Sequence, residues 1–222
     1  MKFSVFASLP IIAFSVALSS LCVANEDPPE VTLDGLQHIK DSNLAMVYAE
    51  PGIDFSQYNR IYLDAAYIAF KKNWQRGQNR GTPNKVTASD MAKIKAELAL
   101  LFRDVFTKTL EDGGYELVTE RAADVLLVKP AIINLDVIAP DTKSAVNAQT
   151  YSESAGEITL YLELHDSLTD DLIAKALDRQ EDRQTGYFQW QNRVSNRAAA
   201  NRILQVWADV LKEGLDEARG VK

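Results

Sequence analysis

Cations and aromatic rings gathered in two segments are the side chains of this sequence best suited to binding chemistry. Residues 71–85 contain five cations, no acid and one tryptophan, and residues 186–197 repeat aromatic rings, amides and arginines. Guanidinium and ammonium groups bind phosphates and carboxylates, and rings beside them are typical of binding interfaces. We predict that both segments form one face for an anionic ligand or a partner protein, made of Lys71, Lys72, Trp74, Arg76, Arg80, Lys85, Tyr187, Trp190, Arg193 and Arg197.

Each segment also has a plainer interpretation. The first is also explained as a solvated connector, and the second as a group of rings that closes the open end of the core. The two interpretations differ in a measurable way. If the face binds, alanine at Trp74, Arg76 and Arg80 should weaken partner capture without lowering the melting temperature.

Groups suited to catalysis or metal binding are sparse. The only histidines, His38 and His165, lie far apart, and neither belongs to a metal-binding spacing. His165 falls on the outward face at a predicted strand end, where we expect a solvated or hydrogen-bonded side chain. No G-x-S-x-G motif is present to build a nucleophile elbow.

The carboxylates offer a weak alternative. Asp166, Asp170 and Asp171 could gather oxygen ligands for calcium, but their spacing fits no EF-hand, and a hairpin turn favours the same residues. Glu181-Asp182 would need another carboxylate across a cleft for acid–base work. We therefore predict no catalytic residue, metal ligand or cofactor, and keep as the alternative an enzyme, a hydrolase, whose carboxylates are brought together by folding.

Length and composition limit the class of protein. The chain has 222 residues, of which 46% are hydrophobic and 25% charged, which is ordinary for a globular protein. Its formal net charge of −7 and sequence pI near 4.9 exclude a protein that wraps nucleic acid over its whole surface. One domain is the expected organisation at this size.

The first 24 residues are predicted to be a secretory signal peptide. Met1-Lys2 precedes an uncharged, largely apolar stretch, and the small residues Cys22 and Ala24 stand at the −3 and −1 positions of a cleavage site before Asn25. Pro10 and the serines argue against an uncleaved anchor helix. Because the residues before Cys22 resemble a lipobox displaced by one position, a lipoprotein anchored through Cys22 stays open as the less favoured alternative.

Export determines the character of the mature chain. Cleavage after Ala24 removes Lys2 and Cys22, which leaves 23 cations, 31 acids and no cysteine. Disulfides, thiol catalysis and cysteine-based metal sites are therefore excluded. We expect a periplasmic protein with no membrane span in its mature form.

We expect residues 25–59 to form an extended lead-in that lies over a single domain of residues 60–222. Residues 60–70 are rich in β-forming side chains and predict a strand. Thr87 and Asp90 form a helix-start signal, apolar residues recur every three or four positions to Leu110, and Gly113-Gly114 ends the helix. A short strand follows at residues 115–118.

The second half predicts a sheet and another helix. Residues 124–138 are almost entirely aliphatic, with Pro130 indicating an edge or a bulge, and residues 140–154 read as a polar loop. Strict alternation from Gly156, a turn at residues 166–171 and a return at 172–183 predict a β-hairpin. An apolar stripe predicts a helix over residues 198–218. The expected fold is α+β, with a mostly antiparallel sheet and two long amphipathic helices in a two-layer sandwich.

The order of these motifs resembles a bacterial exported family known as domain of unknown function 3313. The resemblance rests on Asp54–Asp64, on the helix from Thr87 followed by Gly-Tyr-Glu-Leu-Val, on the hairpin around Asp166, and on the helix that contains Trp207. It covers nearly all of the mature chain and implies an exported envelope protein. Many such proteins are lipoproteins, but the residues before Cys22 depart from the lipobox of a lipoprotein. The family implies no activity or catalytic residue.

These observations together predict a non-enzymatic binding or assembly module of the cell envelope. Its partner is expected to be an envelope protein or an anionic ligand, and not a nucleic acid.

Overall fold

The computed structural model describes residues 28–81, 83, 85–137, 150–152, 154–183, 189–191 and 193–220. The predicted signal peptide, with its cleavage site at Ala24–Asn25 and the candidate lipidation site Cys22, lies outside these residues. No helix in the described part of the chain is long and apolar enough to cross a membrane.

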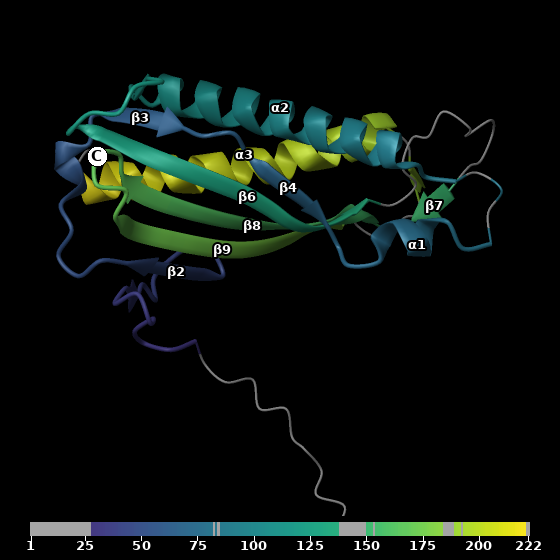
Figure 1. Ribbon diagram of the computed structural model, residues 1–222, viewed down its shortest axis with the longest axis horizontal. Helices are drawn as coiled ribbons and strands as arrows, with labels where there is room; N and C mark the ends of the chain where they lie inside the picture. Colours follow the sequence, from purple (N-terminus) through teal and green to yellow (C-terminus); the bar gives the residue numbers. More distant parts are fainter. Residues whose placement is uncertain are drawn as a thin grey trace, which may run out of the picture.

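An eight-stranded mixed sheet forms the centre of the fold (Figure 1). Its strand order is β1-β2-β9-β8-β6-β3-β5, and β4 also pairs with β6. The strands are β1 (Gln37–His38), β2 (Met46–Ala49), β3 (Arg60–Leu63), β4 (Tyr67–Phe70), β5 (Glu116–Leu117), β6 (Val125–Val137), β8 (Ser154–Asp166) and β9 (Leu172–Arg183). A separate pair joins β7 (Thr150–Ser152) to β10 (Gln189–Gln191), so the predicted loop over residues 140–154 ends in strand structure.

The prediction of a mostly antiparallel sheet is wrong. β3 pairs in parallel with both β5 and β6, and β4 pairs in parallel with β6. A long helix intervenes in the chain between β4 and these later strands, and a crossover of that kind is what parallel pairing requires. The helix was predicted, but the strand pairing that it permits is not encoded in any local pattern.

Two long helices cover one face of the sheet, as predicted. α2 spans Ala88–Asp112 and α3 spans Arg193–Ala218, so α3 begins five residues before the predicted start, whereas α1 is a single short helix over Trp74–Gln78. The two long helices run along the strands in Figure 1. Their apolar faces meet the alternating residues of β6 and β8 in one continuous core, which includes Phe102, Phe106, Leu126, Val128, Ile132, Leu160, Leu162, Leu204 and Trp207.

The start and the end of α2 confirm the sequence signals. The Thr87 hydroxyl accepts a hydrogen bond from the backbone N–H of Asp90 at 3.2 Å, and the Asp90 carboxylate accepts one from the Thr87 N–H at 2.8 Å. This reciprocal pair satisfies two donors that a helix start leaves without an intrahelical partner. Gly113 caps the other end, and Gly114 follows with a φ of +84°.

The β8–β9 hairpin is also confirmed. Ile158, Leu160, Leu162 and Leu164 point into the core, and the chain turns between Asp166 and Leu172. His165 is hydrogen-bonded rather than solvated: its ring nitrogens lie 2.9 Å from the Asp170 carbonyl oxygen and 3.1 Å from a Glu163 carboxylate oxygen.

The segment predicted as one strand over residues 60–70 forms two short strands. β3 ends where Leu63 pairs with Val128, and β4 begins where Tyr67 pairs with Ala131. Pro130 lies opposite the gap between them, at a local edge that suits a residue without a backbone N–H. The bulge of β6 lies elsewhere, between Ile133 and Asp136.

A buried carboxylate joins three parts of the molecule. Asp178 of β9 is 4% exposed and accepts hydrogen bonds from Trp207 Nε1 at 2.7 Å and from the Ala45 N–H at 3.0 Å. Trp207 belongs to α3, and Ala45 precedes β2 in the lead-in. The lead-in therefore supplies an edge strand of the sheet and is tied to the core through the same carboxylate.

Candidate functional site

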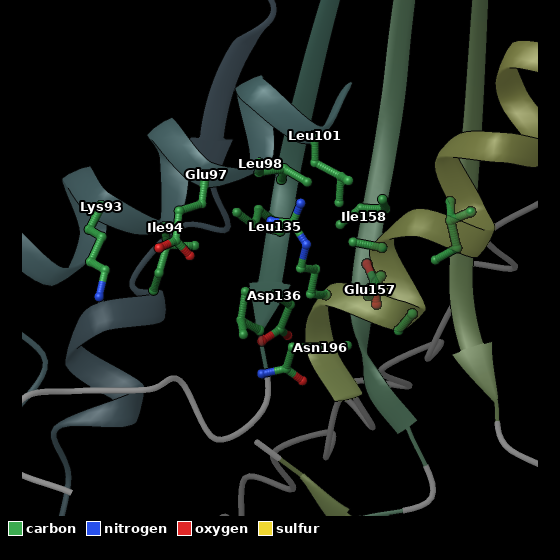
Figure 2. Close-up of a pocket in the computed structure, with 16 residues that line it drawn as sticks. Lys93, Ile94, Glu97, Leu98, Leu101, Leu135, Asp136, Glu157, Ile158 and Asn196 are labelled. Atoms are coloured by element: carbon green, nitrogen blue, oxygen red, sulfur yellow. The ribbon is translucent and has the colours of Figure 1, made fainter. Parts of the chain in front are cut away.

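A cavity of about 120 Å³ lies between α2, the start of α3, the C-terminal end of β6 and the N-terminal end of β8. Figure 2 shows Ile94 and Leu98 descending from α2, Leu135 on β6, and Ile158 on β8. The full lining is Lys93, Ile94, Glu97, Leu98, Leu101, Leu135, Asp136, Val137, Gly156, Glu157, Ile158, Asn196, Arg197, Ala199, Ala200 and Ile203. Most of the wall is therefore aliphatic.

The local sequence explains why space remains here. α3 presents Ala199 and Ala200 to the cavity, where larger side chains would fill it. On the floor, the β6 bulge meets Gly156, which has a φ of +138°; a Cβ there would lie 2.3 Å from the Asp136 carbonyl oxygen. Only glycine permits this approach, so Gly156 fixes the shape of the strand ends beneath the cavity.

Charged side chains surround the opening. Two of the lining acids are held by cations outside the lining: Asp136 pairs with Lys71 at 3.0 Å, and Glu157 pairs with Arg179 at 2.6 Å. The hydrogen bond from Arg179 keeps the pKa of Glu157 below its ordinary value, although partial burial opposes this effect. Both carboxylates are therefore engaged in ion pairs with cations outside the lining.

The remaining charges favour an anion. Lys93 and Arg197 are exposed, and neither forms an ion pair with a residue of the described chain. Glu97 is the remaining lining acid, so two cations stand against one carboxylate after the paired acids are set aside. A small positive surplus therefore lies at the rim of an apolar cavity.

The first predicted binding segment does not form a simple loop, because part of it folds into α1. Trp74 is 5% exposed, stacks on Phe70 with ring centroids 4.2 Å apart, and donates a hydrogen bond from Nε1 to the Val137 carbonyl at 3.2 Å. Trp74 is thus a packing residue that fastens α1 to the end of β6. The cations Lys72, Arg76, Arg80 and Lys85 are exposed, and Lys71 is the partner of Asp136.

The second predicted segment reaches the same end of the molecule. Arg197 lines the cavity, Arg193 is the first residue of α3, and Trp190 lies in β10, opposite Tyr151 of β7. Tyr187 lies outside the described residues. In Figure 1, α1, β7 and the N-terminal half of α2 occupy one end of the sheet, so the structure brings the two segments to a common region.

Sequence reasoning missed the cavity itself. Ile94 and Ile203 belong to the apolar stripes of two helices, and nothing in the local pattern reveals that a cavity remains between them. Gly156 was the available signal, because an isolated glycine at the head of an alternating strand often marks a bulge or a close backbone approach.

The site is better arranged for binding than for acid–base chemistry. Asp136 and Glu157 are partners in the β6–β8 register, but each carries its own cation. A general acid at neutral pH needs a raised pKa, and that of Glu157 is lowered. In the described part of the chain, no three or more His, Cys, Asp or Glu side chains are grouped so that they could hold a metal.

The fold and the cavity define an α+β domain with a mixed sheet, two covering helices and a small apolar cavity at one end. The chain belongs to the family described as protein of unknown function, DUF3313, whose profile matches residues 30–211. This match confirms the resemblance seen in the sequence. No curated protein matches the chain.

Several solved structures are distantly similar. The dodecameric PelC of Paraburkholderia phytofirmans is 11% identical with a TM-score of 0.38, and the match covers 75% of this chain and 96% of PelC. A homologue of a putative neuraminyllactose-binding hemagglutinin from Helicobacter pylori is 11% identical, with a TM-score of 0.36 over 74% of this chain and 90% of its own. A DUF330 protein of Xanthomonas campestris is 13% identical, with a TM-score of 0.35 over 76% and 93%. Similarities at this level carry no information about ligands or partners.

Proposed function

We propose that this protein is a non-enzymatic binding module of the bacterial cell envelope. Its binding region is the end of the molecule formed by α1, the cavity and the start of α3. The observation that carries the proposal is the combination of an apolar cavity with Lys93 and Arg197 at its rim. Exposed cations of the α1 segment, among them Arg76 and Arg80, extend the positive region in a protein whose overall charge is −7.

The predicted signal peptide supports the envelope location. Residues 1–24 have the basic start, apolar middle and small-residue exit of an export signal, and a mature chain starting at Asn25 has no cysteine. The periplasm is the proposed compartment. Anchoring through Cys22 is the alternative, and the two are separated by the N-terminal residue of the mature protein.

The enzyme alternative has less support. Carboxylates do meet at the cavity floor, but each of them already forms an ion pair, Asp136 with Lys71 and Glu157 with Arg179. The lowered pKa of Glu157 also makes its carboxyl group a poor proton donor near neutral pH.

Site-specific photo-crosslinking in living cells tests the binding region. A photo-reactive amino acid replaces Arg76 or Arg80 in α1 and its following turn, and Lys108, an exposed cation at the far end of α2, serves as the matched control. We expect one discrete adduct from the first two positions in the periplasmic fraction, on a chain beginning at Asn25, and none from Lys108. Equal adducts from all three positions, or adducts from Lys108 alone, would contradict the proposal.

A further inference from the structure

We infer that the cavity between α2 and α3 binds the alkyl tail of an amphipathic anion, with the carboxylate or phosphate group of that anion at Arg197 and Lys93. The inference rests on the proposed function and names the class of ligand.

The first support is the size of the cavity. A cavity of about 120 Å³ is close to the cavities of about 150 Å³ that hold a benzene ring. It is smaller than the roughly 300–1,000 Å³ of pockets that enclose whole drug-sized molecules. It therefore accommodates the end of a chain rather than a complete nucleotide or sugar.

The chemistry of the wall gives the second support. Its apolar part is formed by branched aliphatic and alanine side chains. Leu98, Leu101, Leu135, Ile158 and Ala199 are buried, and Ile94, Ala200 and Ile203 are half-buried. No aromatic ring and no hydroxyl side chain of the described chain lines the cavity. A sugar or nucleobase would lose the hydrogen bonds of its polar groups to such a wall and gain no stacking partner. An alkyl segment has no polar groups, so it gives up no hydrogen bonds when it enters the cavity.

The distribution of charge gives the third support. Glu157 and Asp136 are already engaged by Arg179 and Lys71, so they neither attract nor accept a further cation strongly. Arg197 and Lys93 are exposed at the rim and form no ion pair in the described chain. Arginine binds carboxylate and phosphate oxygens with two parallel hydrogen bonds. An anionic head therefore lies within the reach of cations while its tail occupies the apolar space.

A chain-length series tests the inference by isothermal titration calorimetry of the mature protein. The probes are hexanoate, octanoate, decanoate and dodecanoate, all below their micelle-forming concentrations, and the n-alkanols of the same lengths. Each added methylene that enters the cavity should tighten binding about fourfold, and the gain should stop once the cavity is full. Carboxylates should bind more tightly than alkanols of equal length. Dodecanoate and a single-chain phosphatidylglycerol share this chemistry, and their relative affinities identify whether a free fatty acid or a lipid is the better ligand.

Matched variants locate the site. Ala200→Phe fills the cavity, whereas Ala198→Phe places the same ring on the exposed side of α3. We expect the first to reduce decanoate affinity at least tenfold and the second to leave it unchanged. If Ala200→Phe lowers the melting temperature, Ile94→Trp provides a second filling from α2. Arg197→Glu should weaken decanoate severalfold and leave decanol unaffected, with the exposed Arg103→Glu on α2 as its charge control.

The outcomes separate the two proposals. Affinity that is independent of chain length, or that survives both Ala200→Phe and Ile94→Trp, overturns the tail site. Equal binding of carboxylates and alkanols overturns the assignment of an anion. If alkyl probes fail to bind but crosslinks at Arg76 persist, the ligand class is wrong and the binding module stands. If decanoate binds but Arg76 gives no crosslink, the tail site stands and the proposed extension of the binding region to α1 is wrong.

Discussion

At the scale of single residues, Asp166 closes the β8–β9 turn with one carboxylate. Its Oδ1 atom accepts hydrogen bonds from the Leu168 and Thr169 N–H groups at 2.8 and 2.9 Å, and its Oδ2 atom accepts one from the Tyr58 hydroxyl at 3.1 Å. These bonds, led by that from Thr169, hold the pKa of Asp166 below its ordinary 3.8, although partial burial opposes them. Asp166 therefore serves the hairpin turn that was predicted for residues 166–171.

This lowered pKa predicts a pH dependence of stability. A carboxylate whose pKa is lower in the folded state stabilises the fold above its unfolded pKa and loses that contribution as the pH falls through the folded value. Asp166→Asn should therefore reduce the free energy of unfolding at pH 7 by about 1 kcal/mol, and by less at pH 3. Urea denaturation at both pH values measures the difference. Asp171→Asn, an exposed position in the same turn, is the control, and an equal loss at both pH values for Asp166→Asn would refute the assignment.

At the scale of elements, the packing of α1 changes the expectation drawn from sequence for Trp74. Because Trp74 is buried against Phe70 and bonded to Val137, Trp74→Ala should lower the free energy of unfolding by about 3–5 kcal/mol. Arg76→Ala and Arg80→Ala, on the exposed side of the same segment, should stay within about 0.5 kcal/mol. Thermal unfolding compares the stability of the three variants with that of the unchanged protein. An unchanged melting temperature for Trp74→Ala would mean that α1 does not pack as described.

Local elements could be predicted because their signals are local. The Thr87–Asp90 cap and the alternation of β8 each depend on residues within a few positions, and both are confirmed. The partners of β3 and β4 could not be predicted, because a short β-forming run does not encode whether its neighbour is parallel. The burial of Trp74 was missed for a related reason: its partner Val137 lies 63 residues away in sequence.

At the scale of the whole molecule, the two predicted binding segments and the missed cavity occupy the same end. Of the residues predicted to bind, Arg197 lines the cavity and Lys71 pairs with its lining residue Asp136, but the cavity arises from four elements that meet only in the folded chain. The opposite end holds the closed β8–β9 turn and the C-terminal end of α2 (Figure 1). We therefore expect binding to perturb one end of the molecule and leave the other unchanged.

Methyl NMR of the isoleucine side chains is the most direct measurement of this expectation. Ile94, Ile158 and Ile203 line the cavity, whereas Ile61 and Ile173 are buried in the core and do not line it. With decanoate added to the mature protein, we predict shifts of the first three methyl signals that saturate together, with the signals of Ile61 and Ile173 unmoved. Saturable shifts confined to Ile61 and Ile173, or no saturable shift at Ile94, Ile158 and Ile203, would contradict binding at this end.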